Sequence, residues 1–128
     1  MHIINIEKLS EIAEIEFSDI IEDVIPGLNR LRILLREGSF IDIWYSITNP
    51  DRYACHWERK SIDGTIYRHN NAPHKDWEKV STYPKHFHNG TEDRVEASEI
   101  PDNPVDGLRY FLRFVESKIK IEEGKVKE

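Results

Sequence analysis

The strongest constraint on the fold is a period-two alternation of side chains that recurs in short stretches of the chain. Residues 40–47 alternate Phe40, Asp42, Trp44 and Ser46 with Ile41, Ile43, Tyr45 and Ile47. Residues 52–60 alternate in the same way, with Tyr53, Cys55, Trp57 and Arg59 on one side and Ala54, His56 and Glu58 on the other. Successive side chains of a strand point to opposite faces, so these stretches predict strands with two different faces.

Turn residues separate the strands. Glu37-Gly38-Ser39 joins residues 28–36 to residues 40–47 as a β-hairpin, and Asn49-Pro50-Asp51 forms the next turn. Asp63-Gly64 is a hairpin signal before a returning strand at residues 65–69, and residues 94–100 suit a final strand. Residues 70–89 hold two prolines and few aliphatic residues, which indicates a long ordered loop or a short irregular strand. The sequence therefore predicts an antiparallel meander.

Helices are predicted at both ends of the chain. Residues 6–15 carry apolar side chains at helical spacing behind Asn5, a suitable N-cap. Residues 16–25 fit helix or strand, and Pro26-Gly27 interrupts the pattern. Asn103-Pro104 opens a helix whose apolar stripe comprises Leu108, Phe111, Leu112, Val115 and Ile119. We therefore predict an α+β domain over residues 1–122: an antiparallel β-meander sheet of four to six strands with an N-terminal and a C-terminal helix packed on it. Residues 123–128 form a charged tail that is expected to fray.

Composition narrows the functional class. The chain has 128 residues and a single cysteine, and its apolar runs are too short to cross a membrane. These features, with no signal peptide at the start, indicate the cytoplasm. A net charge of −6 argues against a simple nucleic-acid coat. Residues 51–94 are the least acidic part, with 8 Lys and Arg against 7 Asp and Glu, so an anionic ligand is expected there.

Five of the six histidines lie between His56 and His88. Histidine titrates near neutral pH and binds metals when neutral, so the cluster suggests a site. If residues 86–88 are extended, the rings of His86 and His88 lie on one side, roughly 7 Å apart. A short link could bring His69 near His74. A zinc site at His74, His86 and His88 is then one hypothesis, although the spacing matches no strong metal motif.

Acid–base chemistry on RNA is a second hypothesis. Metal-independent cleavage of RNA needs a base, an acid and a cation that holds the phosphate. The acid and base would come from His56, His74, His86 and His88. Arg59, Arg68 and Lys85 would hold phosphate. Asn71 would also bind the substrate. The bases would stack on the aromatic residues Trp44, Trp57, Trp77, Tyr67 and Tyr83.

A structural role is the alternative to both hypotheses. Trp57 and Tyr67 would then be cross-strand aromatic partners, and Asn70-Asn71 would close a turn. The histidines would bond backbone groups of the long loop. Under this interpretation Glu58 and Arg59 form a solvated pair and Cys55 is a small buried residue.

Three phrases resemble the TumE-like family of small toxins from two-gene toxin–antitoxin systems. They are Tyr53-Ala54-Cys55-His56-Trp57, then Ile66 to His74 with its Asn-Ala-Pro-His ending, then Ser81 to Gly90 with Pro-Lys-His-Phe-His. The resemblance covers roughly residues 28–116. The family often has Asp at the position of His69 and commonly His at the position of Lys85, whereas His74, His86 and His88 match its pattern.

The resemblance implies a cytoplasmic toxin of a type II system that acts on RNA or translation through the histidine-rich region. Its partner would be a small DNA-binding antitoxin. The alternative is a non-catalytic binding or structural module whose histidine loops are structural or bind a transition metal. A homodimer through the sheet near Trp44 and Tyr45 is also expected.

Overall fold

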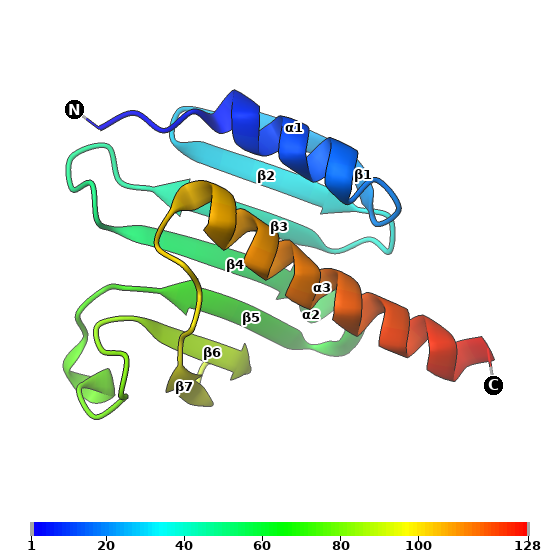
Figure 1. The fold of residues 1–128 in the computed structure, drawn as a ribbon. Helices are drawn as coiled ribbons and strands as arrows, with labels where there is room; N and C mark the ends of the chain where they lie inside the picture. The colour runs from blue at the N-terminus through cyan, green and yellow to red at the C-terminus, as the bar shows by residue number, and fades with distance from the viewer. Residues whose placement is uncertain (1, 128) are drawn as a thin grey trace.

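The computed structural model describes residues 2–127 and contains one sheet and two long helices (Figure 1). The chain begins with α1 (Ile6–Glu16) and ends with α3 (Pro104–Lys127). The strands between them are β1 (Ile21–Gly27), β2 (Arg30–Leu35), β3 (Phe40–Tyr45), β4 (Tyr53–Arg59), β5 (Thr65–Asn70), β6 (His86–Gly90) and β7 (Val95–Ala97). Two single turns, α2 (Lys60–Asp63) and the 3₁₀ helix η1 (Lys75–Trp77), complete the fold.

The seven strands follow one another in the sheet in chain order, and each pairs antiparallel with the next. Both long helices lie on the same side of the sheet, with α1 over its first strands and α3 across its middle (Figure 1). The predicted α+β meander with terminal helices is therefore confirmed, with more strands than the four to six expected. We call the side under α1 and α3 the helix face and the other side the open face.

The additional strands come from the stretches with ambiguous patterns. Strand β1 runs through Pro26-Gly27, which the sequence suggested as a break. A proline is tolerated there because β1 is an edge strand and needs no ladder bond on its outer side. Strand β6 lies inside the expected long loop. At Asp63-Gly64, the helical turn α2 replaces a tight hairpin, and Gly64 ends it with a φ of 79°.

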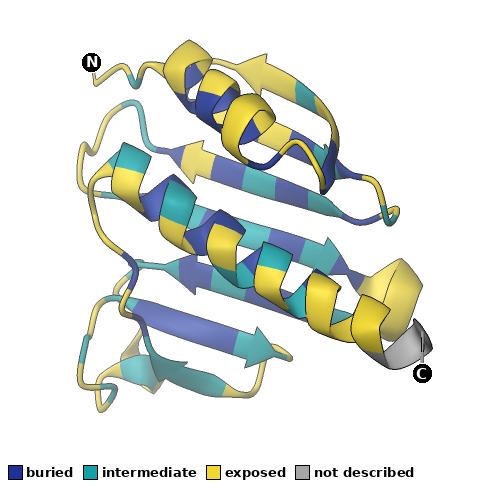
Figure 2. Ribbon diagram, turned by 45° about the vertical axis from the view of Figure 1, so that its right-hand side comes forward, coloured by how far each residue is buried: buried dark blue, intermediate teal, exposed yellow. Residues whose placement is uncertain are grey.

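The core lies between the helix face and the two long helices. Trp57, Ile33 and Ile41 are fully buried, and the predicted stripe of α3 is buried along its length. Figure 2 shows buried positions alternating mainly with intermediate ones along the central strands, and with exposed or intermediate ones around both helices. Both predicted caps are present: Asn5 Oδ1 accepts from Lys8 N at 3.2 Å, and Asn103 Oδ1 accepts from Val105 N at 3.0 Å. Cys55 is buried as predicted, and burial raises the pKa of its thiol to about 12.

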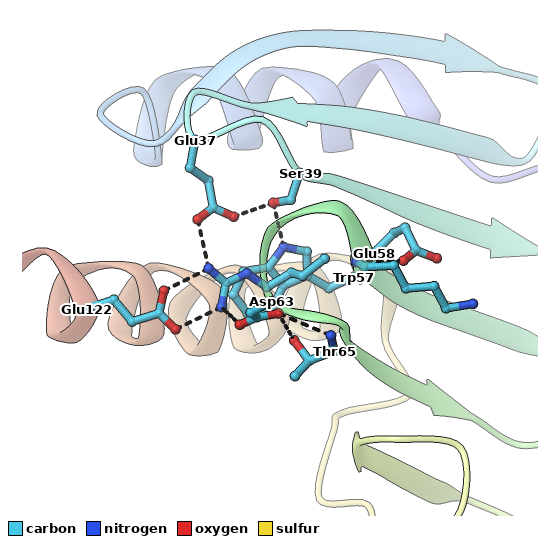
Figure 3. Close-up of polar contacts among 9 residues, drawn as sticks. Glu37, Ser39, Trp57, Glu58, Asp63, Thr65 and Glu122 are labelled. Carbon is cyan, nitrogen blue, oxygen red and sulfur yellow. Dashed lines mark hydrogen bonds and ion pairs between the residues drawn. The ribbon is translucent and has the colours of Figure 1, made fainter.

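The C-terminal part of α3 is tied to the sheet through Arg59, the last residue of β4. The guanidinium donates to Glu122 Oε1 and Oε2 at 2.8 and 2.7 Å, to Glu37 at 3.0 Å and to Asp63 at 3.0 Å (Figure 3). Its carbon lies 4.7 Å from the Trp57 ring centroid. Arg59 is only 1% exposed, and Glu58 points to the other face, so the predicted solvated Glu58–Arg59 pair is wrong.

Helix α3 continues through Lys127, beyond residue 123 where the charged tail was expected to begin. The hydrogen bonds that Arg59 donates to Glu122 are the main reason why the pKa of the Glu122 carboxyl is lowered. The division of the chain into one domain and a tail stays a prediction.

Removing the buried cation should strongly destabilise the fold. We expect Arg59→Ala to lower the free energy of unfolding by about 3–5 kcal/mol, because three carboxylates are left facing one another without a counter-charge. Urea denaturation followed by circular dichroism measures the change. Arg113→Ala, which removes an exposed arginine of α3, is the control. Equal stability of the two variants would contradict a structural role for Arg59.

Candidate functional site

Polar side chains line up across four strands of the open face. The strand register places Asp42 opposite His56, His56 opposite Arg68, and Arg68 opposite His88. We call these four residues the polar row. Neighbouring strands are about 4.8 Å apart, so Arg68 on β5 stands directly between a histidine of β4 and a histidine of β6. The alternation of these strands puts the row on the face that neither long helix covers.

Arg68 fixes the proton of His56. Its Nε donates to His56 Nδ1 at 3.1 Å, and because a guanidinium is always a donor, Nδ1 must be the acceptor. The ring proton of neutral His56 therefore sits on Nε2, which lies 3.3 Å from Glu58 Oε1. Although partial burial acts to raise it, the pKa of Glu58 is lowered by hydrogen bonds from the Lys60 N–H and His56. His56 is thus held between a cation at Nδ1 and a carboxylate at Nε2.

The other end of Arg68 is occupied by an internal carboxylate. Nη1 and Nη2 donate to the two oxygens of Glu92 at 3.0 and 2.5 Å, a bidentate pair that lowers the pKa of Glu92. Glu92 lies in the connection between β6 and β7. Each of the three nitrogens of Arg68 therefore has a partner, and an anion that takes the bidentate position has to displace Glu92.

His86 and His88 present the opposite tautomer. The Nδ1 of His88 lies 3.0 Å from the Glu92 carbonyl oxygen, and that of His86 lies 3.0 Å from the Pro84 carbonyl oxygen. A carbonyl only accepts, so Nδ1 carries the proton and Nε2 carries the lone pair of each neutral ring. Among the described residues, neither Nε2 has a hydrogen-bond partner. Burial lowers the pKa of His88, which favours the neutral ring at neutral pH.

Three of the predicted histidines lie around the ring of Trp77. Its ring centroid lies 6.1 Å from His74, 6.2 Å from His86 and 5.9 Å from His88. The rings of His86 and His88 are 5.0 Å apart, closer than the spacing expected of extended backbone alone. His74 lies at the exposed rim, where its Nδ1 accepts from Asp76 N at 3.2 Å and caps η1. The half-buried Trp77 therefore packs beside both buried histidines.

The zinc hypothesis stays a prediction. Within residues 2–127, the structure places no three His, Cys, Asp or Glu side chains so that they could hold a metal ion. The rings of His86 and His88 lie 5.0 Å apart, and each carries its lone pair on Nε2. Their Nδ1–H to carbonyl bonds are of the kind that orient metal-binding histidines.

His69 lies on the other side of the sheet and is not part of this group. It pairs in register with Phe87, stacks on that ring at 4.3 Å, and bonds Ser98 Oγ through Nδ1 at 2.7 Å. Burial, with smaller effects from Lys85 and His86, lowers its pKa to about 3. The idea that a short link brings His69 to His74 is therefore wrong, because β5 directs His69 into the core.

Lys85 and Asn71 lie in a separate pocket at the end of the central strands. Lys85 Nζ donates to the Ile100 carbonyl and lies 3.3 Å from Asp102 Oδ1. Asn71 Oδ1 accepts from Tyr53 N at 3.0 Å. The pocket has a volume of about 280 Å³. In the described structure both residues serve mainly to fasten the loops, and they do not face the polar row.

The predicted stacking residues divide between the two faces. Trp57 and Tyr67 are cross-strand partners on the helix face, 5.3 Å apart and buried against Phe114, so neither ring offers a face to a base. Trp44 is 40% exposed on the open face, and Tyr83 is 39% exposed on the loop before β6. Of the two residues expected at a dimer contact, Tyr45 is buried and Trp44 is exposed.

Sequence reasoning missed the two carboxylates that bind His56 and Arg68, which are Glu58 and Glu92. Glu58 had a visible signal, because it follows His56 by two residues on the same polar side of a predicted strand. Glu92 had none. It reaches Arg68 only because the β6–β7 hairpin folds back over the open face.

A family model described as toxin TumE matches residues 4–119, which is most of the chain. Comparisons with curated proteins and with solved structures gave no match. None of the helices within residues 2–127 combines the length and apolar character that crossing a membrane requires.

The buried His69 should make stability depend on pH. Its folded pKa of about 3 lies below the ordinary value of 6.5, so the unfolded chain binds a proton that the folded chain refuses. The free energy of unfolding is therefore highest above pH 6.5. It falls as the pH decreases toward 3, with a slope of up to about 1.4 kcal/mol per pH unit. Urea denaturation between pH 7 and 4 measures this slope.

His69→Gln keeps a polar group near Ser98 and removes the titration, so its pH dependence should be shallower. The exposed His74→Gln is the control. Parallel curves for the parent and His69→Gln would contradict the assignment.

Proposed function

The chain belongs to the toxin TumE family, and on this premise we propose that it is the toxin of a type II toxin–antitoxin system that acts in the cytoplasm by cleaving RNA. The observation that carries this proposal is the position of Arg68 directly between His56 and His88 on three adjacent strands. Metal-independent cleavage of RNA needs a base and an acid on either side of a phosphate and a cation that holds it. In the polar row, Arg68 would hold the phosphate, and the two histidines would lie on either side of it.

His88 is the proposed base. Its Nδ1 proton is held by the Glu92 carbonyl, which leaves Nε2 free to accept the proton of a ribose 2′-hydroxyl. Because burial lowers its pKa, the ring stays neutral and ready to accept at neutral pH. The 2′-oxygen then attacks phosphorus and forms a 2′,3′-cyclic phosphate, while the bond from phosphorus to the 5′-oxygen breaks.

His56 is the proposed acid. When Arg68 turns from His56 and Glu92 to the phosphate, Nδ1 becomes free to bind a second ring proton, and Glu58 stabilises the resulting imidazolium through Nε2. The Nδ1 proton passes to the departing 5′-oxygen. The ring then returns to the neutral Nε2–H tautomer that the resting structure shows.

The antitoxin is the expected protein partner. Residues 1–50 carry 4 Lys and Arg against 9 Asp and Glu, and most of these carboxylates lie on α1, β1 and the turn between them. Such a surface favours a basic segment of a small DNA-binding antitoxin, because opposite charge speeds docking and aligns the partners. This surface is distinct from the polar row.

A non-catalytic toxin is the second candidate, and one observation favours it. His86 and His88 bond the Pro84 and Glu92 carbonyls, which belong to the two loops that flank β6. In this view the histidines hold the loops for a binding surface, or bind a transition metal. Their replacement would lower the melting temperature together with toxicity, and a chelator would change melting in the metal version.

Substitutions in the polar row should reduce RNA cleavage while the protein still folds. We expect His56→Gln and Arg68→Lys each to slow cleavage of a single-stranded RNA about 100-fold or more, because each removes one element of acid–base or charge catalysis. The measurements are growth after induced expression and cleavage by the purified protein. His2→Gln, which replaces a histidine outside the row, is the control and should match the parent. Full toxicity of Arg68→Lys would contradict the proposal.

Cleavage should persist in the presence of a chelator and leave 2′,3′-cyclic phosphate ends. Both follow from a mechanism that uses only side chains and the 2′-hydroxyl. Mass spectrometry of the fragments identifies these ends. Inactivation by the chelator, restored by zinc, would instead support the metal alternative at His74, His86 and His88.

The pH profile should report the base. Because the pKa of His88 is lowered, the base stays unprotonated as the pH falls past the ordinary histidine value of about 6.5. We therefore expect the acid limb of kcat/KM to lie below pH 6.5. A limb at or above that value would contradict the assignment of His88 as the base.

A further inference from the structure

A shallow pocket opens at the opposite end of the open face from His88. Its volume is about 430 Å³, and its lining includes Pro26, Gly27, Arg30, Arg32, Asp42 and Trp44. Asp42 is also the first residue of the polar row, so the pocket and the row adjoin. Pockets of this volume accommodate small organic groups, a nucleotide among them.

Trp44 forms an exposed aromatic platform in this pocket. The residue is 40% exposed, and its register partners are Arg30 on β2 and Ala54 on β4. The hollow lies on the side of β1 and β2, between the indole and the residues Pro26, Gly27 and Arg30. An exposed tryptophan beside a hollow of this kind suits stacking by a base.

Arg30 supplies a cation that is not already neutralised. It is exposed, and among the described residues it has no carboxylate partner, unlike Arg32 and Arg68. Its stem lies against Gly27, where an added Cβ would come within 3.0 Å of Arg30 Cγ. Arg32 is fixed beside it by bidentate bonds to Asp42 at 2.8 and 2.7 Å and lies 4.4 Å from the Phe40 ring.

We infer that this pocket is a nucleotide-binding subsite for the single-stranded RNA whose backbone reaches the polar row, with Trp44 stacking on a base and Arg30 contacting a phosphate. The inference rests on the proposed function and adds a site that positions the strand. Strands β3 and β5 are two spacings apart, about 10 Å, so a few nucleotides connect the pocket to Arg68. Recognition by stacking requires unpaired bases, and the substrate class is therefore single-stranded rather than duplex RNA.

The test is binding of a 2′-O-methyl RNA oligonucleotide, which lacks the attacking hydroxyl and cannot be cleaved. Fluorescence anisotropy compares the parent with Trp44→Ala, Arg30→Ala and Tyr110→Ala. Tyr110 is the matched control, since it is 38% exposed on α3 in the other layer. We expect Trp44→Ala to raise Kd at least about fivefold, Arg30→Ala to flatten the salt dependence, and Tyr110→Ala to stay within about twofold of the parent.

Equal affinity of Trp44→Ala and Tyr110→Ala would overturn the subsite. So would a parent dimer that Trp44→Ala dissociates and that the oligonucleotide does not affect, because a second copy would then cover the pocket. Binding that depends on Trp44, without cleavage of unmodified RNA, would support the subsite while contradicting the proposed catalysis. Cleavage that is unchanged by Trp44→Ala, in a parent that does not bind the oligonucleotide, would leave the proposed function standing and reject the subsite.

Discussion

The buried charge of Arg59 is the interaction on which the arrangement of both faces depends. A guanidinium that is 1% exposed requires anionic partners, and it obtains them from the β2–β3 turn, α2 and α3. The same cluster includes Trp57, whose indole N–H donates to Ser39 Oγ at 2.9 Å. One side chain therefore joins the far end of α3 to a turn and to the centre of the sheet (Figure 3).

This constraint also determines which side chains reach the open face. In a strand, a slip of one residue would turn every side chain to the other face. With Trp57 and Arg59 committed to the helix face, His56 and Glu58 must face outward. The register with β5 and β6 then carries that alternation to Arg68 and His88. The polar row is thus a consequence of how the core is packed, and the register of the central strands fixes the backbone positions of its residues.

Sequence reasoning succeeded where a period or a cap was strong. The faces of residues 40–47 and 52–60, both helices and the Asn5 and Asn103 caps could be predicted, because local spacing decides them. The contacts of His69 could not, since its partner Phe87 lies on β6, within a stretch that resembles a loop. The Arg68–Glu92 pair could not be predicted either, because the two residues are far apart in the sequence and meet only through the pairing of β5 with β6. The histidine phrases predicted a single site, whereas the tertiary structure separates their residues among the polar row, the surface near Trp77, the core and the pocket beside Lys85.

The open face holds cations that the fold has already neutralised. Arg32 is paired with Asp42 and Arg68 with Glu92, each in a bidentate arrangement that matches what a phosphate would offer. Binding of an anion at Arg68 is therefore an exchange of one oxyanion for another, and its net free energy is smaller than the gross attraction. Weak or monodentate anions gain little from such an exchange. A polyanion anchored elsewhere on the same face gains more, because the exchange then takes place within one complex at a high effective concentration. Under the proposed function, the internal carboxylates would thus favour an extended nucleic-acid strand over free phosphate.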